Sequence, residues 1–278
     1  MRSLGTHDVL TALLMEAAGF ELTFVGGFST SATLHGLPDL DFLGLAEMRD
    51  AVGRVARRVS MPVIADADTG HGDLHNVAHT TREFETTGAA GLILEDQVAP
   101  KRCGHFEEKQ VVSSDEFLLK IRAAVHGRND PDFVIVARTD ARATHGIDEA
   151  IDRVNRACDV GADVAFVEAP LSVAEIEAVS RRVTAPKLIN MLAFGKTPLL
   201  SASQLEELGF KIVVAPIASL LVAAKAVQEL CKSYLRDGHT GAVLEHMLTF
   251  EEMKETLGVR KHLELKSALE EPPPPAAN

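Results

Sequence analysis

Aromatic residues are scarce in this sequence. Its 278 residues include no tryptophan and a single tyrosine, Tyr234. Proteins that bind bases commonly stack them on aromatic rings. The sequence therefore offers few side chains for holding bases or sugars by stacking.

Cysteines are few as well, and their number is odd. The three thiols are Cys103, Cys158 and Cys231, and their separation matches no zinc-binding pattern. Disulfide pairs are typical of secreted proteins, whereas reduced thiols are typical of the cytosol. We therefore expect a cytoplasmic protein.

The sequence also lacks an excess of positive charge and any long apolar run. A net charge of −12 argues against nucleic acid or an anionic membrane as a partner. The first residues, MRSLGTHDVLTALLMEAAGF, carry Asp8 and Glu16 and show no long apolar run of a signal peptide or membrane anchor. We expect no membrane association.

What the sequence does contain is a regular alternation of short apolar segments with helical patterns. Apolar strands separated by helices indicate a parallel sheet covered on both faces, and so many units in one chain favour a closed barrel. No GxGxxG motif follows the first strand, which weakens the dinucleotide-binding alternative. The predicted fold is a (β/α)8 TIM barrel. The predicted strands are Arg2–Gly5 (the weakest), Leu22–Val25, Pro62–Ala65, Gly91–Glu95, Phe133–Ala137, Val164–Val167, Lys187–Ile189 and Ile212–Ala215.

Three parts of the chain are predicted. Residues 1–249 form the barrel, which is the catalytic domain. Residues 250–269 form a C-terminal helix that leaves the barrel, a common way to reach a partner subunit. Residues 270–278 contain four consecutive prolines and are expected to be disordered.

Polar side chains follow the apolar strands at the point where each strand ends. In a barrel of this kind the catalytic residues lie at the C-terminal strand ends. Each such residue alone can be a helix cap or a salt bridge in a turn, but the repetition indicates an active site. The residues are Asp66, Asp68, Glu95, Asp96, Arg138, Glu168 and Asn190.

Three of these carboxylates suggest a metal site. Asp66, Asp68 and Glu95 offer hard oxygen ligands, which suit Mg²⁺, with Mn²⁺ as the alternative. Without a cation the clustered charges would repel one another. The structural alternative is that Asp66 and Asp68 flank a turn closed by Gly70 and Gly72.

Other residues suit a carboxylate substrate. Arg138 offers a planar fork for one carboxylate, and the backbone N–H groups of Gly26 and Gly27 can meet a second. A metal between them would polarise an oxygen, and Cys103 or His105 would move a proton. Such a site stabilises an enolate.

Cys103 belongs to an unusual loop, LEDQVAPKRCGH, at residues 94–105. The thiol is set among Lys101, Arg102 and His105, and Gly104 is expected to give the backbone unusual freedom there. The alternative is a polar surface loop in which Cys103 is merely tolerated. The charged surroundings favour a functional thiol.

The segments GLILEDQVAPKRCGH, PVIADADTGHG and VIVARTDA together resemble the isocitrate lyase/phosphoenolpyruvate mutase superfamily, from about Gly26 through the last strand. The resemblance implies a swapped final helix, a homotetramer built as a dimer of dimers, and Mg²⁺ held by Asp66, with Asp68 and Glu95 acting mainly through waters. It implies that KRCGH is a mobile gating loop of the lyase branch that delivers Cys103 as the acid. The implied catalytic residues are Cys103, His105, Arg138 and Glu168, and the implied substrate-binding residues are Gly26, Gly27, Asp39, Gly104, Arg138 and Asn190.

Departures from the family pattern bear on the substrate. Leu221 and Phe250 stand where the lyases of isocitrate and methylisocitrate carry arginines, so a small dicarboxylate is favoured over a tricarboxylate. Phe24 replaces a tyrosine proposed as the base. The expected activity is Mg²⁺-dependent C–C cleavage of a 2-hydroxy or hydrated 2-oxo dicarboxylate such as a 2-alkylmalate. The alternatives are carboxyphosphoenolpyruvate phosphonomutase, methylisocitrate lyase and a non-catalytic metabolite-binding barrel.

Overall fold

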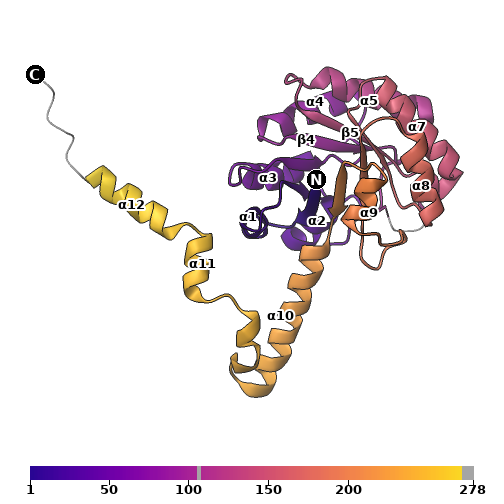
Figure 1. Cartoon of the computed structure of the whole chain (residues 1–278). Coiled ribbons are helices and arrows are strands. Elements are labelled where there is room, and N and C mark those ends of the chain that lie inside the picture. Colours follow the sequence, from indigo (N-terminus) through magenta and orange to yellow (C-terminus); the bar gives the residue numbers. More distant parts are fainter. Residues whose placement is uncertain (105–107, 271–278) are drawn as a thin grey trace, which may run out of the picture. The chain divides into compact units, whose positions relative to one another are not determined.

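The computed structural model describes residues 1–104 and 108–270, and its strands close into a parallel barrel in the order β1 to β8 (Figure 1). The predicted (β/α)8 barrel is confirmed, and the weak first strand is part of it. The strands are β1 Arg2–Thr6, β2 Leu22–Val25, β3 Val63–Asp66, β4 Gly91–Glu95, β5 Val134–Thr139, β6 Val164–Val167, β7 Lys187–Asn190 and β8 Ile212–Ala215.

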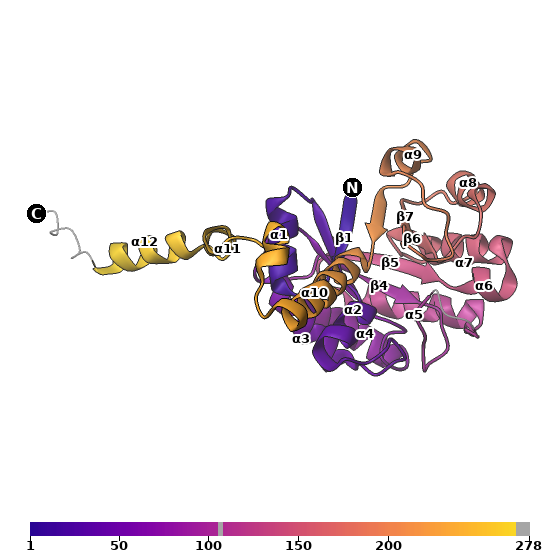
Figure 2. The same ribbon diagram turned by 90° about the horizontal axis from the view of Figure 1, so that it is seen from below.

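Helices alternate with the strands and lie outside the barrel, as Figure 2 shows for α5, α7 and α8. Several begin at a side chain that accepts a hydrogen bond from the first turn, among them Asp8 before α1 and Ser113 before α5. The helical segments are α1 Val9–Ala17, α2 Gly27–His35, α3 Leu45–Ala56, α4 Leu74–Thr86, α5 Ser114–Gly127, α6 Ala141–His145, α7 Ile147–Asp159, α8 Val173–Arg182, α9 Ala202–Glu207, α10 Ala218–Asp237, the 3-10 helix η1 Gly241–His246, α11 Phe250–Thr256 and α12 Val259–Glu270.

The chain divides into two compact units, Met1–Leu221 and Val222–Asn278. The first contains all eight strands. In the second, the C-terminal helix expected over residues 250–269 is two helices, α11 and α12. They are separated at Leu257 and Gly258, and Gly258 has a φ of +69°, which only glycine adopts at little cost. The tail from residue 271 lies outside the described residues. Within the described ranges no helix is long and apolar enough to cross a membrane.

Side chains along each strand point alternately into the barrel and out toward the helices, and the inward-pointing ones fill the barrel. Successive side chains of a strand point to opposite faces, so every second residue points inward. Ile93 of β4, Val136 of β5 and Phe166 of β6 form part of one buried interior cluster. Their neighbours Leu92, Leu94, Ile135, Ala137, Ala165 and Val167 pack instead in the clusters under the outer helices.

On five of the strands, β3 to β7, the next inward position is polar. Two residues after Ile64, Ile93, Val136, Phe166 and Leu188 come Asp66, Glu95, Arg138, Glu168 and Asn190, at the C-terminal mouth of the barrel. The same parity that buries the apolar residues therefore directs these polar side chains into one space.

Candidate active site

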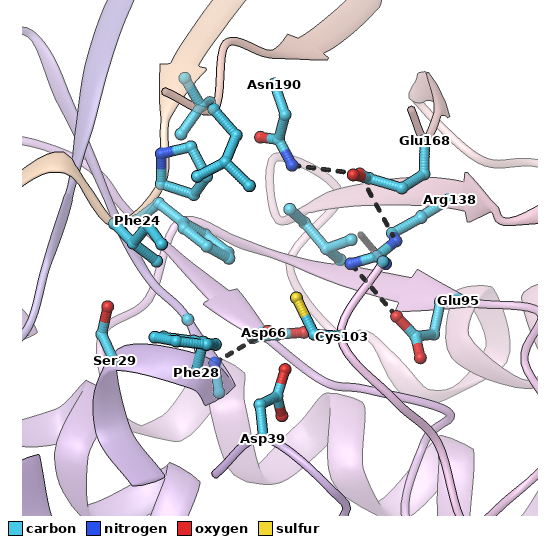
Figure 3. Close-up of a pocket in the computed structure, with 18 of the residues that line it drawn as sticks. Phe24, Phe28, Ser29, Asp39, Asp66, Glu95, Cys103, Arg138, Glu168 and Asn190 are labelled. Atoms are coloured by element: carbon cyan, nitrogen blue, oxygen red, sulfur yellow. Dashed lines mark hydrogen bonds and ion pairs between the residues drawn. The ribbon is translucent and has the colours of Figure 1, made fainter. Parts of the chain in front are cut away.

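One cavity at the mouth of the barrel collects the residues predicted from strand ends (Figure 3). Its wall includes one residue at, or directly after, the C-terminal end of each of seven strands, β2 to β8. These are Gly26, Asp66, Glu95, Arg138, Glu168, Asn190 and Pro216. Asp39, Gly27, Cys103 and Gly104 also line it, so the structure brings together most of the predicted site. His105 lies outside the described residues.

Arg138 is the electrostatic centre of the cavity. Its Nη1 lies 3.2 Å from Oε2 of Glu95, and its Nε lies 3.0 Å from Oδ2 of Asp140 and 3.9 Å from Oε2 of Glu168. Burial alone would lower the pKa of the guanidinium, but the three carboxylates raise it well above its ordinary value. Arg138 therefore stays charged. Its Cζ lies over the Phe166 ring, 5.6 Å from the ring centroid, in a cation–π contact.

Glu168 is held on two sides. Asn190 donates its Nδ2–H to Oε2 of Glu168 at 3.1 Å, and Arg138 approaches the same oxygen. Figure 3 shows these three side chains and Glu95 directed into the same space as the Cys103 sulfur. The predicted grouping of Arg138, Glu168 and Asn190 is thus present in the structure.

Asp66 and Asp68 form a second charged group at the edge of the cavity. The backbone N–H of Gly27, the first residue of α2, donates to Oδ2 of Asp66 at 2.9 Å. Lys101 Nζ lies 2.6 Å from Oδ1 of Asp68 and 2.6 Å from Oδ1 of Asp39, and its side chain is 5% exposed. The ammonium of Lys101, which was expected only to flank the cysteine, is therefore buried among carboxylates.

The acidic residues at this edge fit a hard divalent cation. Burial, and for Asp66 the neighbouring Asp68, raise the pKa values of Asp66 and Glu95 above their ordinary range. Glu95 Oε1 is buried and accepts no hydrogen bond from the described residues. A cation would satisfy this oxygen and relieve the repulsion.

The three predicted ligands do not, however, converge on one point. Among the described residues no three His, Cys, Asp or Glu side chains are arranged as a ready metal site. Asp68 pairs with Lys101, and Glu95 pairs with Arg138. The ligand set Asp66, Asp68 and Glu95 stays a prediction.

Gly104 has a role different from the one predicted. Its φ is not in the left-handed region, so conformational freedom is not what requires glycine. A Cβ at this position would lie 2.4 Å from Nη2 of Arg138 and 2.7 Å from Cγ of Glu168. Glycine is needed because the loop backbone approaches these two side chains directly.

Part of the cavity lining is apolar, and this lining was not predicted from the sequence. Of the residues that form it, only Phe24 is singled out in the sequence analysis, as a departure from the family pattern. The sequence signal that could have indicated this lining is the position of Val214, which is one of the alternate residues of β8 that point into the barrel. The apolar residues lining the cavity are Phe24, Phe28, Ile93, Phe166, Leu192, Val214, Pro216 and Ile217.

A barrel whose C-terminal strand ends present a buried arginine, several carboxylates and a cysteine loop has the arrangement of an enzyme active site. Comparison with known proteins also indicates an enzyme. A model of the family described as phosphoenolpyruvate phosphomutase matches residues 3–235. The 2,3-dimethylmalate lyase of Eubacterium barkeri is 41% identical over 262 residues, which is 94% of this chain and 91% of the lyase. The 2-methylisocitrate lyase of Halalkalibacterium halodurans is 42% identical over 253 residues, 91% of this chain and 83% of that enzyme.

Solved structures give the same result. Oxaloacetate acetylhydrolase in complex with 3,3-difluorooxalacetate superposes with a TM-score of 0.92 at 34% identity, covering 96% of this chain and 91% of that one. Phosphonopyruvate hydrolase in complex with oxalate and Mg²⁺ superposes with a TM-score of 0.86 at 28% identity, covering 96% and 93%. The chain belongs to the phosphoenolpyruvate mutase/isocitrate lyase superfamily, and it is an enzyme of that superfamily.

Proposed function

We propose that this chain is a divalent-cation-dependent lyase that cleaves a C–C bond of a small 2-hydroxy dicarboxylate such as a 2-alkylmalate, or of a hydrated 2-oxo dicarboxylate. The observation that carries the proposal is that Cys103, Arg138, Asp66 and Glu95 line one cavity. A proton donor, a carboxylate-binding cation and hard oxygen ligands then surround a single small substrate.

Two carboxylates suit this cavity better than three. Arg138 offers guanidinium N–H groups to one of them. The N-terminus of α2, which Gly26 caps, suits the other carboxylate. So does the buried Oγ of Ser29, which has no hydrogen-bond partner among the described residues. By the resemblance to the family, Leu221 and Phe250 stand where its tricarboxylate lyases carry arginines. Without these arginines, burial of a third carboxylate would cost on the order of several kcal/mol.

The apolar wall favours an alkyl substituent on the substrate. Phe24, Leu192, Val214 and Ile217 present only carbon atoms of their side chains to the cavity. Each methyl group buried against such a wall contributes roughly 0.8 kcal/mol. An alkylated malate is therefore the preferred substrate over oxaloacetate. The relative that is a 2,3-dimethylmalate lyase supports this choice.

The cofactor that suits the acidic edge is Mg²⁺, with Mn²⁺ as the alternative. Asp66 would hold it, and Asp68 and Glu95 would act mainly through waters. When bound, such an ion stabilises negative charge on the substrate oxygen. The related phosphonopyruvate hydrolase, whose structure contains oxalate and Mg²⁺, supports a divalent ion here.

The side chains divide the proton transfers between them. Phe24 has no titratable group, and Asp140 is occupied by Arg138 and Lys109. We assign the base that removes the hydroxyl proton to Glu168, whose side chain lines the cavity. The C2–C3 bond then breaks in a retro-aldol sense, its electron pair becomes the enolate, and the Cys103 thiol gives its proton to the enolate carbon.

The proposed function is tested by incubating the enzyme and Mg²⁺ with 2,3-dimethylmalate, 2-methylmalate, oxaloacetate and methylisocitrate, and by identifying the products. We expect the alkylated malates to be cleaved with the highest kcat/KM. Preferred cleavage of methylisocitrate would replace the dicarboxylate assignment with the tricarboxylate one. Phosphonate formation from carboxyphosphoenolpyruvate, or binding of all these acids without turnover, would reject a lyase.

Metal addition is expected to stabilise the protein. At saturating Mg²⁺ the metal-free protein should gain about 3 kcal/mol, which raises Tm by roughly 5–10 °C. Differential scanning calorimetry before and after chelation measures the shift. Asp66→Asn should remove most of it, whereas Asp163→Asn, an acid paired with Arg128 at 2.7 Å, should retain it. Equal shifts in both variants would contradict a metal site at Asp66.

The subunit arrangement is also proposed. Helices α11 and α12 expose Phe250, Leu263 and Leu269 at 79%, 61% and 75%, and such apolar side chains are normally covered by protein. We assign the cover to a second copy of the chain, with residues 250–269 packing on the partner in a cytoplasmic homotetramer. Light scattering of the full chain tests this, and a monomeric mass would refute it.

A further inference from the structure

The loop that carries Cys103 stands on a short paired stem. Gln97 and Val111 form an isolated antiparallel bridge, and the N–H of Val112 donates to the carbonyl of Asp96 at 2.8 Å. The Gln97 amide clamps the backbone of Arg102: its Nε2 donates to the Arg102 carbonyl at 2.8 Å, and its Oε1 accepts from the Arg102 N–H at 3.0 Å. One side of Cys103 is therefore fixed through the residue before it.

Lys109 holds the other side of Cys103. This lysine comes after the cysteine in the loop, and its side chain is 2% exposed. Its Nζ donates both to the carbonyl of Gly104 and, at 2.7 Å, to Oδ1 of Asp140. A buried ammonium needs such partners, because an unpaired one would be costly. The residues on both sides of Cys103 are thus bound by buried side chains.

Asp140 links this lysine to the substrate-binding arginine. Its Oδ2 accepts from Nε of Arg138 at 3.0 Å, while Oδ1 accepts from Lys109. Its backbone N–H donates to Oδ1 of Asp96 at 2.8 Å, and Arg153 in turn binds Oδ2 of Asp96 at 3.0 Å. Burial would raise the pKa of Asp140, but Arg138 and Lys109 outweigh it and hold the pKa at about 2. Asp140 is therefore a fixed, charged link.

We propose that Lys109 and Asp140 are positioning residues that tie the carbonyl of Gly104 to the guanidinium of Arg138, so that the thiol of Cys103 and the carboxylate-binding group are placed together. The inference rests on the proposed function, in which Cys103 is the acid and Arg138 holds the substrate. Neither positioning residue lines the cavity wall described above. Their effect is exerted through the loop backbone and through Arg138.

Three lysine variants test this inference. Lys109→Met keeps the length of the side chain and removes its positive charge and its N–H donors. Lys109→Arg keeps the charge and the donors. Lys187→Met is the matched control, because Lys187 is also buried and its Nζ donates to a backbone carbonyl, that of Val183, at 3.1 Å. Lys187 begins β7, at the opposite end of the strand from the site.

We expect Lys109→Met to lower kcat about 10- to 100-fold with KM changed less than about threefold, because the acid is displaced while Arg138 remains. Lys109→Arg should recover part of the loss, and Lys187→Met should match the wild type. Asp140→Asn should raise KM in addition, because it weakens the hold on Arg138. Melting curves establish that each variant is folded. Should Lys109→Met not fold, Asp140→Asn serves as the same test.

A second readout does not depend on turnover. Alkylation of Cys103 by iodoacetamide, followed peptide by peptide by mass spectrometry, should become several-fold faster in Lys109→Met, with Cys158 and Cys231 unchanged. Unchanged alkylation of Cys103 in both Lys109→Met and Asp140→Asn overturns the inference. If no acid is turned over by the wild type, the proposed function fails, and the alkylation rates alone still decide whether the link exists.

Discussion

Replacement of Cys103 by serine is expected to lower kcat by about 10³-fold while oxalate still binds in the presence of Mg²⁺. A serine hydroxyl is nearly the size of a thiol but a much weaker acid, and general acid catalysis is typically worth 10²- to 10⁴-fold, about the loss expected here. Cys103 lines the cavity together with Arg138 and Glu168, so no other thiol of the described chain replaces it there. Steady-state kinetics and calorimetric titration with oxalate measure the two effects.

The control for this variant is Cys231→Ser, since Cys231 is exposed on α10. It should keep the kcat of the wild type. Near-normal kcat in Cys103→Ser would remove the thiol from the mechanism and leave it as a passive part of the wall. Loss of oxalate binding in that variant would indicate a disturbed loop rather than a missing acid.

The second large effect is expected from Arg138→Lys. Lysine keeps the positive charge but loses the planar fork, and with it about two charge-assisted hydrogen bonds worth roughly 1.5–3 kcal/mol each. The lysine ammonium recovers part of this lost binding free energy. The value of kcat/KM should therefore fall about 10²- to 10³-fold. The fall should appear in both KM and kcat, because Arg138 also contacts Glu95 and Glu168.

Arg128→Lys provides the comparison for Arg138. Arg128 is also paired with a carboxylate, that of Asp163, at 2.7 Å, and bonds the carbonyl of Phe133 at 3.0 Å. It precedes β5, whereas Arg138 lies near the end of that strand, so its replacement should leave kcat/KM unchanged. A similar loss in both variants would mean that Arg138 acts through stability and not through the substrate.

The barrel was predictable because its signals are local. Apolar strands ending in a charged or polar residue repeat along the chain. Because alternate residues of a strand point inward, Glu95, Arg138 and Glu168 all point into the C-terminal mouth of the barrel. Helix α2 has no clear sequence signal, because its sequence GFSTSATLH is rich in serine and threonine and lacks an apolar stripe. It nevertheless supplies the N–H of Gly27 to the site.

The links between distant segments could not be predicted from the sequence. Lys101 reaches Asp39, 62 residues away, and Lys109 reaches Asp140, 31 residues away. A charged residue in a loop has no sequence signal that distinguishes burial in such a pair from exposure to water. Gly104 was noticed, but only coordinates show that its backbone faces Arg138.

The division of the cavity between strand ends and later loop residues has an evolutionary consequence. Glu95 and Arg138 form a buried ion pair, so substitution of either one leaves a buried charge that the barrel must accommodate. By contrast, Phe28, Leu192 and Ile217 lie beyond the strands, in α2 and in the connections after β7 and β8. Exchanging their side chains resizes the space around the substituent without altering strand register. If the proposed function holds, we therefore expect the substrate range to change through substitutions at these three positions, which leave the charged residues at the strand ends in place.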